Sequence, residues 1–150
     1  MIIFLDIDGV VKSYDGYSAG NLALVKRLCE ETGAEIVLTS DLRIPRPGEH
    51  WEMRKALGEA GLTKLLHSEW YTPFNGWEKG IRWTEVRDWL ERNDDVVSYV
   101  ILEDAFDHFD AAPEEMAHRI VWCNNRHGFV EELYDRALSV LKQPTPNPHE

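Results

Sequence analysis

Short apolar runs alternate along the chain with segments whose apolar residues recur at helical spacing. Four runs of β-forming residues are typical of buried strands: residues 1–7, 34–39, 98–102 and 119–122. Helical spacing predicts four helices, within residues 22–33, 53–61, 82–92 and 129–141. Strands that alternate with helices predict a three-layer, Rossmann-like α/β fold, in which a parallel sheet is covered by helices on both faces.

The remaining segments carry turn residues and prolines. Residues 12–20 are rich in turn formers, and residues 43–50 hold two prolines and a glycine, which predicts a loop. The aromatic stretch 67–80 is broken by Pro73 and Gly76 and fits neither a helix nor a strand period. Three prolines within residues 143–150 predict a disordered tail after a single domain of residues 1–142.

Composition and charge narrow the class of protein. Hydrophobic residues make up 43% of the chain and charged residues 29%, as in soluble globular domains. No apolar run approaches the roughly 20 residues that span a membrane, and Cys29 and Cys123 match no metal or redox spacing. We therefore expect a cytoplasmic protein with two reduced core thiols. A net charge of −11 argues against extensive non-specific nucleic-acid binding, although a local basic patch remains open.

Polar side chains follow three of the predicted strands. They are Asp6 and Asp8 after the first run, Thr39, Ser40 and Asp41 after the second, and Glu103 and Asp104 after the third. Ligands of parallel α/β sheets bind beyond the carboxyl ends of the strands, so these groups are expected to converge there. Crowded carboxylates repel one another unless a cation neutralises them, and oxygen ligands of this kind suit Mg²⁺. Taken singly, each group could instead be a turn, a helix cap or a solvated loop.

The same segments resemble the motifs of a known family. FLDIDGVV resembles the first motif of the haloacid dehalogenase (HAD) superfamily of phosphohydrolases, IVLTSDLR the second and YVILEDAFD the fourth. The chain looks most like the small HAD-type phosphatase domain of RNA-repair and polynucleotide-end-healing proteins. In those relatives the third motif has the form RGxEIxxWL, which residues 82–90 (RWTEVRDWL) resemble. The likeness extends from residue 2 to about residue 141.

Two departures from the family pattern leave alternatives open. The fourth motif reads Glu103-Asp104 where end-healing relatives generally show Asp-Asp, which leaves open which carboxylate holds the metal. Lys79 lies three residues before Arg82, so either could be the basic residue of the third motif, and Trp83 replaces the usual glycine.

The resemblance implies a phosphatase mechanism. Asp6 would be the nucleophile that forms an aspartyl-phosphate, and Asp8 the general acid and base. Mg²⁺ would be held by Asp6, the Asp8 backbone carbonyl and Asp104, with Glu103 acting through water.

The phosphate oxygens would need donors and a positive charge. Thr39 or Ser40 would donate a hydroxyl hydrogen bond to the phosphate, and Thr39 is favoured because it lies nearer the strand end. Arg82 or Lys79 would stabilise the charge on the phosphoryl oxygens.

The intervals between motifs leave no room for a large cap domain. In the family, capless members have open sites that often accept macromolecular substrates, which fits a polynucleotide 3′-phosphate or another macromolecular phosphate. Arg43, Arg46 and Trp51 could hold a nucleotide by charge and stacking, or Trp51 could lie in the core and the arginines in solvent.

Two other functions remain open, and the sequence predicts no oligomeric state. The chain could be a small-molecule or nucleotide phosphatase with residues 67–80 as a partial lid. It could also be a non-catalytic interaction module whose carboxylates bind only metal and phosphate.

Overall fold

A five-stranded parallel sheet forms the centre of the computed structural model, which describes residues 1–146. The strands are β1 (Ile2–Leu5), β4 (Glu35–Leu38), β5 (Leu66–Tyr71), β6 (Tyr99–Glu103) and β7 (Ile120–Trp122), in the order β5-β4-β1-β6-β7. All four neighbouring pairs are parallel. The predicted α/β sheet is confirmed, with the first predicted strand at its centre.

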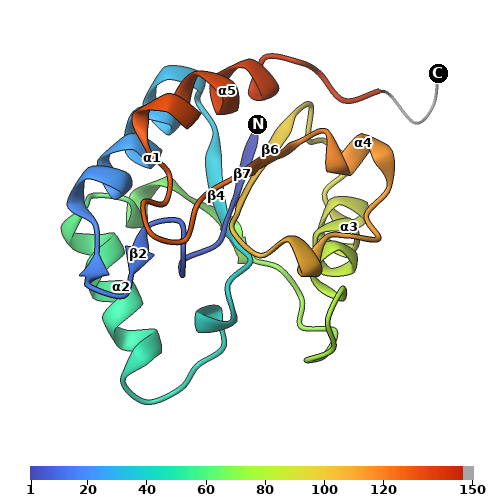
Figure 1. Cartoon of the computed structure of the whole chain (residues 1–150). Coiled ribbons are helices and arrows are strands. Elements are labelled where there is room, and N and C mark those ends of the chain that lie inside the picture. The colour runs from blue at the N-terminus through green and yellow to red at the C-terminus, as the bar shows by residue number, and fades with distance from the viewer. Residues whose placement is uncertain (147–150) are drawn as a thin grey trace.

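Helices cover both faces of the sheet (Figure 1). On one face lie α1 (Ala19–Thr32), α2 (Glu49–Glu59) and α5 (Glu131–Leu141), and on the other lie α3 (Arg82–Arg92) and the short α4 (Glu114–Ala117). Side chains alternate along β1 accordingly. Ile3 and Leu5 belong to the core under α1, α2 and α5, whereas Phe4 packs edge-on against Trp89 of α3, with ring centroids 5.4 Å apart.

Local sequence signals fix the ends of α1. The Ser18 side chain accepts a hydrogen bond from the Asn21 backbone N–H, which is the ordinary N-cap interaction. Gly33 ends the helix with a φ of 75°, a left-handed conformation that favours glycine.

Several elements differ from the sequence-based expectation. The stretch 67–80 contributes the edge strand β5, and residues 12–20 form a small hairpin of β2 (Lys12–Ser13) and β3 (Gly16–Tyr17). Helix α2 begins at Glu49, inside the expected loop, and α4 was not predicted. Three 3₁₀ helices, η1 (Asp41–Arg43), η2 (Thr63–Leu65) and η3 (Phe106–His108), connect these elements.

The expectations about tail, thiols and membrane have separate outcomes. Part of the expected tail lies along the loop before β6, where the Thr145 N–H donates to the Val97 carbonyl at 2.8 Å, and residues 147–150 lie outside the described residues. Cys29 and Cys123 are free and buried, as expected. Within residues 1–146, no helix has both the length and the apolar character needed to cross a bilayer.

The carboxyl edge of the sheet carries no cap domain. Within the described residues, the hairpin, α1 and β4 fill the interval between Asp8 and Thr39, and η1, α2, η2 and β5 fill most of the interval from Thr39 to Arg82. The edge is therefore bordered by loops, the β2–β3 hairpin and η1, without a cap domain, as the motif spacing predicted.

Candidate active site

The three central strands bring their next residues to the same level. Leu5 of β1 lies in register with Leu38 of β4 and with Leu102 of β6, so Asp6, Thr39 and Glu103 follow in one row. The Asp6 N–H donates to the Leu102 carbonyl at 3.1 Å, and the Thr39 N–H donates to the Leu5 carbonyl at 3.0 Å. Because side chains alternate along a strand, all three point to the face that α3 covers.

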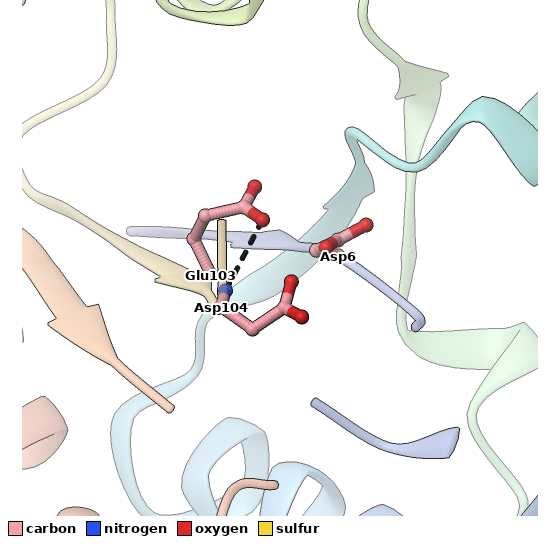
Figure 2. Close-up of side chains that lie close together, drawn as sticks. All are labelled: Asp6, Glu103 and Asp104. Carbon is pink, nitrogen blue, oxygen red and sulfur yellow. Dashed lines mark hydrogen bonds between the residues drawn. The ribbon is translucent and has the colours of Figure 1, made fainter. Parts of the chain in front are cut away.

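Three carboxyl groups meet at this edge. One carboxylate oxygen from each of Asp6, Glu103 and Asp104 lies within 4.8 Å of the other two. We call these three residues the acidic cluster. Figure 2 shows the three groups directed toward a common space. Asp6 is only 4% exposed and Glu103 is fully buried. The strand-end pattern thus correctly predicted that acidic residues far apart in the sequence converge.

Glycine at position 9 lets Asp104 approach the turn after β1. Gly9 has a φ of 80°, and a Cβ built there would lie 2.0 Å from an Asp104 carboxylate oxygen. The first motif therefore needs glycine for two reasons, the backbone conformation and the space that Asp104 occupies.

Arg82, the first residue of α3, supplies positive charge to the cluster. One Nη atom lies 3.5 Å from Asp6 and 3.4 Å from Glu103, and the other lies 3.1 Å from Asp41. Burial lowers the pKa of the Arg82 guanidinium, but the charges of Asp6, Glu103 and Asp41 outweigh it and raise the pKa overall, so the residue stays cationic.

Lys79 lies away from this network. Its side chain is 87% exposed and its ammonium group is 3.9 Å from the carboxylate of Asp107. Of the two basic residues that the sequence left open, the structure places Arg82 against the acidic cluster.

The acidic cluster fits a divalent cation. Burial raises the pKa of Asp6 well above its usual value, and the Glu103 charge raises it further while Arg82 opposes the shift. Burial likewise raises the pKa of Asp104 to about 6. One arginine does not offset three neighbouring carboxylates, so a cation with oxygen ligands would stabilise their ionised forms.

Glu103 has a more limited role than Asp6 and Asp104. One of its oxygens accepts hydrogen bonds from the backbone N–H groups of Asp104 and Ala105, both at 3.1 Å, and the other faces Arg82. The side chain thus holds the loop that carries Asp104.

The two candidate hydroxyls differ in their hydrogen bonds. The Ser40 hydroxyl accepts from the Leu42 N–H at 3.2 Å and caps η1. The Thr39 hydroxyl is buried and has no hydrogen-bond partner among the described residues. A buried hydroxyl without a partner costs free energy, so Thr39 has an unused donor beside Asp6.

This difference predicts opposite effects of two substitutions. Thr39→Val should raise the free energy of unfolding by about 1 kcal/mol, because it removes a buried hydroxyl that has no partner among the described residues. It should nevertheless lower kcat/KM for a phosphomonoester by about 10²-fold to 10³-fold, the range for loss of one donor to developing charge. Ser40→Ala should instead cost about 1 kcal/mol of stability, since it removes a cap. Chemical denaturation and steady-state kinetics on both variants distinguish the roles, and a larger kinetic loss in Ser40→Ala would reverse the assignment.

Asp8 lies on the open side of the site. It is exposed, and with Gly9 and Asp104 it lines a cavity of about 610 Å³. A carboxyl group in this position has access to solvent and to a bound molecule, as a general acid and base requires.

The three residues suggested for substrate binding lie in different environments. Arg43 is buried, and its guanidinium donates to the backbone carbonyls of Thr39, Ser40, Thr72 and Pro73. It also pairs with the buried Glu85 at 3.1 Å. The expectation that Arg43 contacts substrate is replaced by a structural role, because all its nitrogen atoms are bonded within the protein.

Arg46 and Trp51 remain on the surface. Trp51 is 64% exposed, with the Lys55 ammonium 5.6 Å from its ring centroid, and Arg46 lies 4.9 Å from the ring centroid of Trp77. The alternative that Trp51 lies in the core is wrong, and the sequence did not single out the pair of Arg46 with Trp77.

Sequence reasoning gave no role to other residues beside the site. Asp41 was noted after the second strand, yet its contact with Arg82 depends on where α3 begins. Lys12 and Arg126 come from the hairpin and from the loop after β7, and only the fold brings them to the lining of one cavity. For Lys12, the sequence did hold a signal, because residues 12–20 are rich in turn formers and directly follow the first motif.

Comparison with known proteins agrees with this geometry. A family model described as the HAD domain in Swiss Army Knife RNA repair proteins matches residues 2–133. The chain belongs to this HAD family. Membership indicates a hydrolase of the phosphatase type, and HAD domains generally use Mg²⁺, for which the acidic cluster offers ligands. No curated protein and no solved structure gave a significant match.

Proposed function

We propose that this HAD domain is a Mg²⁺-dependent phosphomonoesterase that acts through an aspartyl-phosphate on Asp6 and takes phosphate from polynucleotide 3′ ends. The observation that carries the proposal is the position of Asp6, in the middle of the carboxyl edge, between Asp104, Glu103 and Arg82. Asp8 follows two residues later, on the side that opens to solvent.

In the first half of the reaction, an Asp6 carboxylate oxygen attacks phosphorus. The bond between phosphorus and the leaving oxygen breaks, and that oxygen takes its electron pair together with a proton from Asp8. Arg82 and the Thr39 hydroxyl stabilise the charge on the phosphoryl oxygens.

In the second half, Asp8 accepts a proton from water. The water oxygen bonds to phosphorus, the bond to Asp6 breaks, and inorganic phosphate leaves with the Asp6 carboxylate restored. A bound Mg²⁺ would be held by Asp6 and Asp104, with Glu103 behind them, and would offset the repulsion between the phosphate and the carboxylates.

Three observations support a polynucleotide substrate. The matched family model is named for RNA repair proteins. The site is open, without a cap. Aromatic side chains with cationic neighbours, Trp51 with Lys55 and Trp77 with Arg46, lie on segments that follow β4 and β5, beside the same carboxyl edge. Proteins that bind single-stranded nucleic acid without sequence preference do so through exposed aromatic and basic side chains.

A panel of substrates tests the proposal. With Mg²⁺, the protein should hydrolyse p-nitrophenyl phosphate slowly and a 3′-phosphorylated oligonucleotide with at least about tenfold higher kcat/KM, since remote contacts contribute binding free energy. EDTA should abolish both activities, and added Mg²⁺ should restore them. Full activity in EDTA would contradict the metal site.

The alternatives predict other outcomes of the same panel. A preference for nucleoside monophosphates over oligonucleotides would indicate a small-molecule phosphatase. Absence of turnover, together with a Mg²⁺-dependent rise in melting temperature, would indicate a binding module.

A further inference from the structure

A cavity of about 610 Å³ opens directly beside Asp8 and has no part in the chemistry described so far except through Asp8 and Asp104. One wall is the hairpin β2–β3 and the other is the loop between β7 and α5. Its lining combines Asp8 and Asp104 of the reaction site with Lys12, Tyr14, Asp15 and Arg126. Its volume lies within the range of about 300–1,000 Å³ that is usual for small-molecule sites.

The two walls are joined to each other at Val10. The Val10 carbonyl accepts hydrogen bonds from the Phe129 N–H at 2.8 Å and from the Asn21 side-chain amide at 3.1 Å. The same amide donates to the His127 carbonyl at 2.9 Å. Gly128 has a φ of 70°, and a Cβ there would lie 2.3 Å from the Val10 oxygen. The two walls of the cavity are therefore held together by hydrogen bonds and close packing around the Val10 carbonyl.

The charges on the lining divide into two groups. Asp8 and Asp104 belong to the reaction site, which leaves Asp15 as the remaining carboxylate, against Lys12 and Arg126. Within residues 1–146 the Arg126 guanidinium makes no ion pair, and only its backbone N–H is bonded, to the Asn124 side chain at 2.8 Å. Apart from the two carboxylates of the reaction site, the lining therefore offers two cationic side chains against one carboxylate to a bound molecule.

We propose that this cavity receives the leaving group of the substrate, and that Arg126, with Lys12, binds a second phosphate carried by that leaving group. This inference rests on the proposed phosphatase function, because Asp8 protonates the leaving oxygen at the mouth of the same cavity. A guanidinium presents paired N–H donors that match two phosphate oxygens. Lys12, from the hairpin wall, adds a point charge.

The rest of the cavity fits a nucleoside between the two phosphates. Tyr14, at the turn of the hairpin, is fully exposed and lines the cavity, so its ring is free to stack on a base. Ser13 and Asn125 offer hydroxyl and amide groups for a sugar. The substrate class is thus a nucleotide phosphomonoester with a second phosphate, either a free bisphosphate or the last residue of a strand.

Four substrates test this inference: p-nitrophenyl phosphate, a nucleoside 3′-monophosphate, the 3′,5′-bisphosphate, and a dinucleotide that ends in a 3′-phosphate. Wild-type protein should show at least about tenfold higher kcat/KM for the bisphosphate and the dinucleotide than for the monophosphate, the usual effect of a charge-assisted hydrogen bond. Arg126→Ala should lower this ratio by about tenfold, and Lys12→Ala should lower it to a smaller degree.

Matched controls exist at the opposite edge of the sheet. Arg92, at the end of α3, and Lys64, just before β5, are exposed and lie on the amino side of the strands. Arg92→Ala and Lys64→Ala remove the same charges far from the cavity and should keep the wild-type ratio.

The outcomes separate this inference from the function on which it rests. If the wild-type protein hydrolyses p-nitrophenyl phosphate but prefers neither two-phosphate substrate, only the second-phosphate site is overturned. The same holds if Arg126→Ala lowers all four rates equally, or if a preference for the dinucleotide alone persists in that variant. If no phosphate ester is hydrolysed, the proposed function fails, and the leaving-group site fails with it.

Discussion

Replacing Asp6 by asparagine is expected to abolish turnover and, at the same time, to stabilise the metal-free protein. Loss of the nucleophile should lower kcat by at least about 10³-fold, as removal of a residue that forms the covalent intermediate does in other enzymes. Burial and the charge of Glu103 both raise the pKa of Asp6, so its ionised form is unfavourable in the fold without a cation. The neutral amide removes that cost, which is about 1.4 kcal/mol for each unit of raised pKa.

The sign of the pH effect follows from the direction of this shift. A carboxyl group whose pKa is raised in the folded state costs no stability below its ordinary pKa of 3.8, and the cost grows as the pH rises through the folded value. The stability gain of Asp6→Asn in EDTA should therefore be small near pH 4 and larger at pH 7. Urea denaturation at both pH values measures it.

Asp95 provides the matched control, because it is exposed in the loop before β6, at the opposite edge of the sheet. Asp95→Asn should change neither turnover nor the pH dependence of stability. Retained activity in Asp6→Asn would remove the proposed nucleophile, and a loss of metal-free stability at pH 7 would contradict the electrostatic account of the acidic cluster.

Substitution of Arg82 should have the second-largest effect, and substitution of Lys79 almost none. Arg82→Ala leaves Asp6 and Glu103 without their counter-charge, which should cost about 3 kcal/mol of stability without metal. Arg82→Lys keeps the charge but loses the planar fork that reaches three carboxylates, so it should fold and show about 10²-fold lower kcat/KM.

Lys79→Ala removes an exposed side chain in a long ion pair with Asp107, so the stability should change by less than about 0.5 kcal/mol. Steady-state kinetics and chemical denaturation of Arg82→Ala, Arg82→Lys and Lys79→Ala, each with and without Mg²⁺, test the predicted changes in activity and in stability. A greater loss of activity in Lys79→Ala than in Arg82→Lys would show that Lys79 supplies the charge to the phosphate.

The central part of the fold could be predicted because its sequence signals are strong. Strands β1, β4 and β6 are almost wholly apolar, since neighbouring strands and helices bury them on both sides, and such runs are distinctive. Strand β5 was not recognised because an edge strand is only half covered, and His67, Ser68 and Glu69 give it a polar sequence. The hairpin β2–β3 has two residues in each strand, too few for a pattern.

The candidate site was predictable to the extent that it lies at strand ends. Asp6, Thr39 and Glu103 needed only the assumption of parallel strands in register. The buried role of Arg43 was not predictable, since an arginine in a loop with prolines reads as a solvated residue unless the positions of Thr72 and Glu85 are known. Arg126 likewise had no local signal.

In the proposed mechanism, the junction at Val10 would join the selection of the leaving group to proton transfer. Val10 lies two residues after Asp8, and its carbonyl holds the loop that carries Arg126 through Phe129 and Asn21. A molecule that displaces that loop would therefore also displace the turn that carries Asp8, the proposed proton donor. We therefore expect a poorly fitting alcohol to lower both the affinity for the substrate and the rate at which the leaving oxygen is protonated.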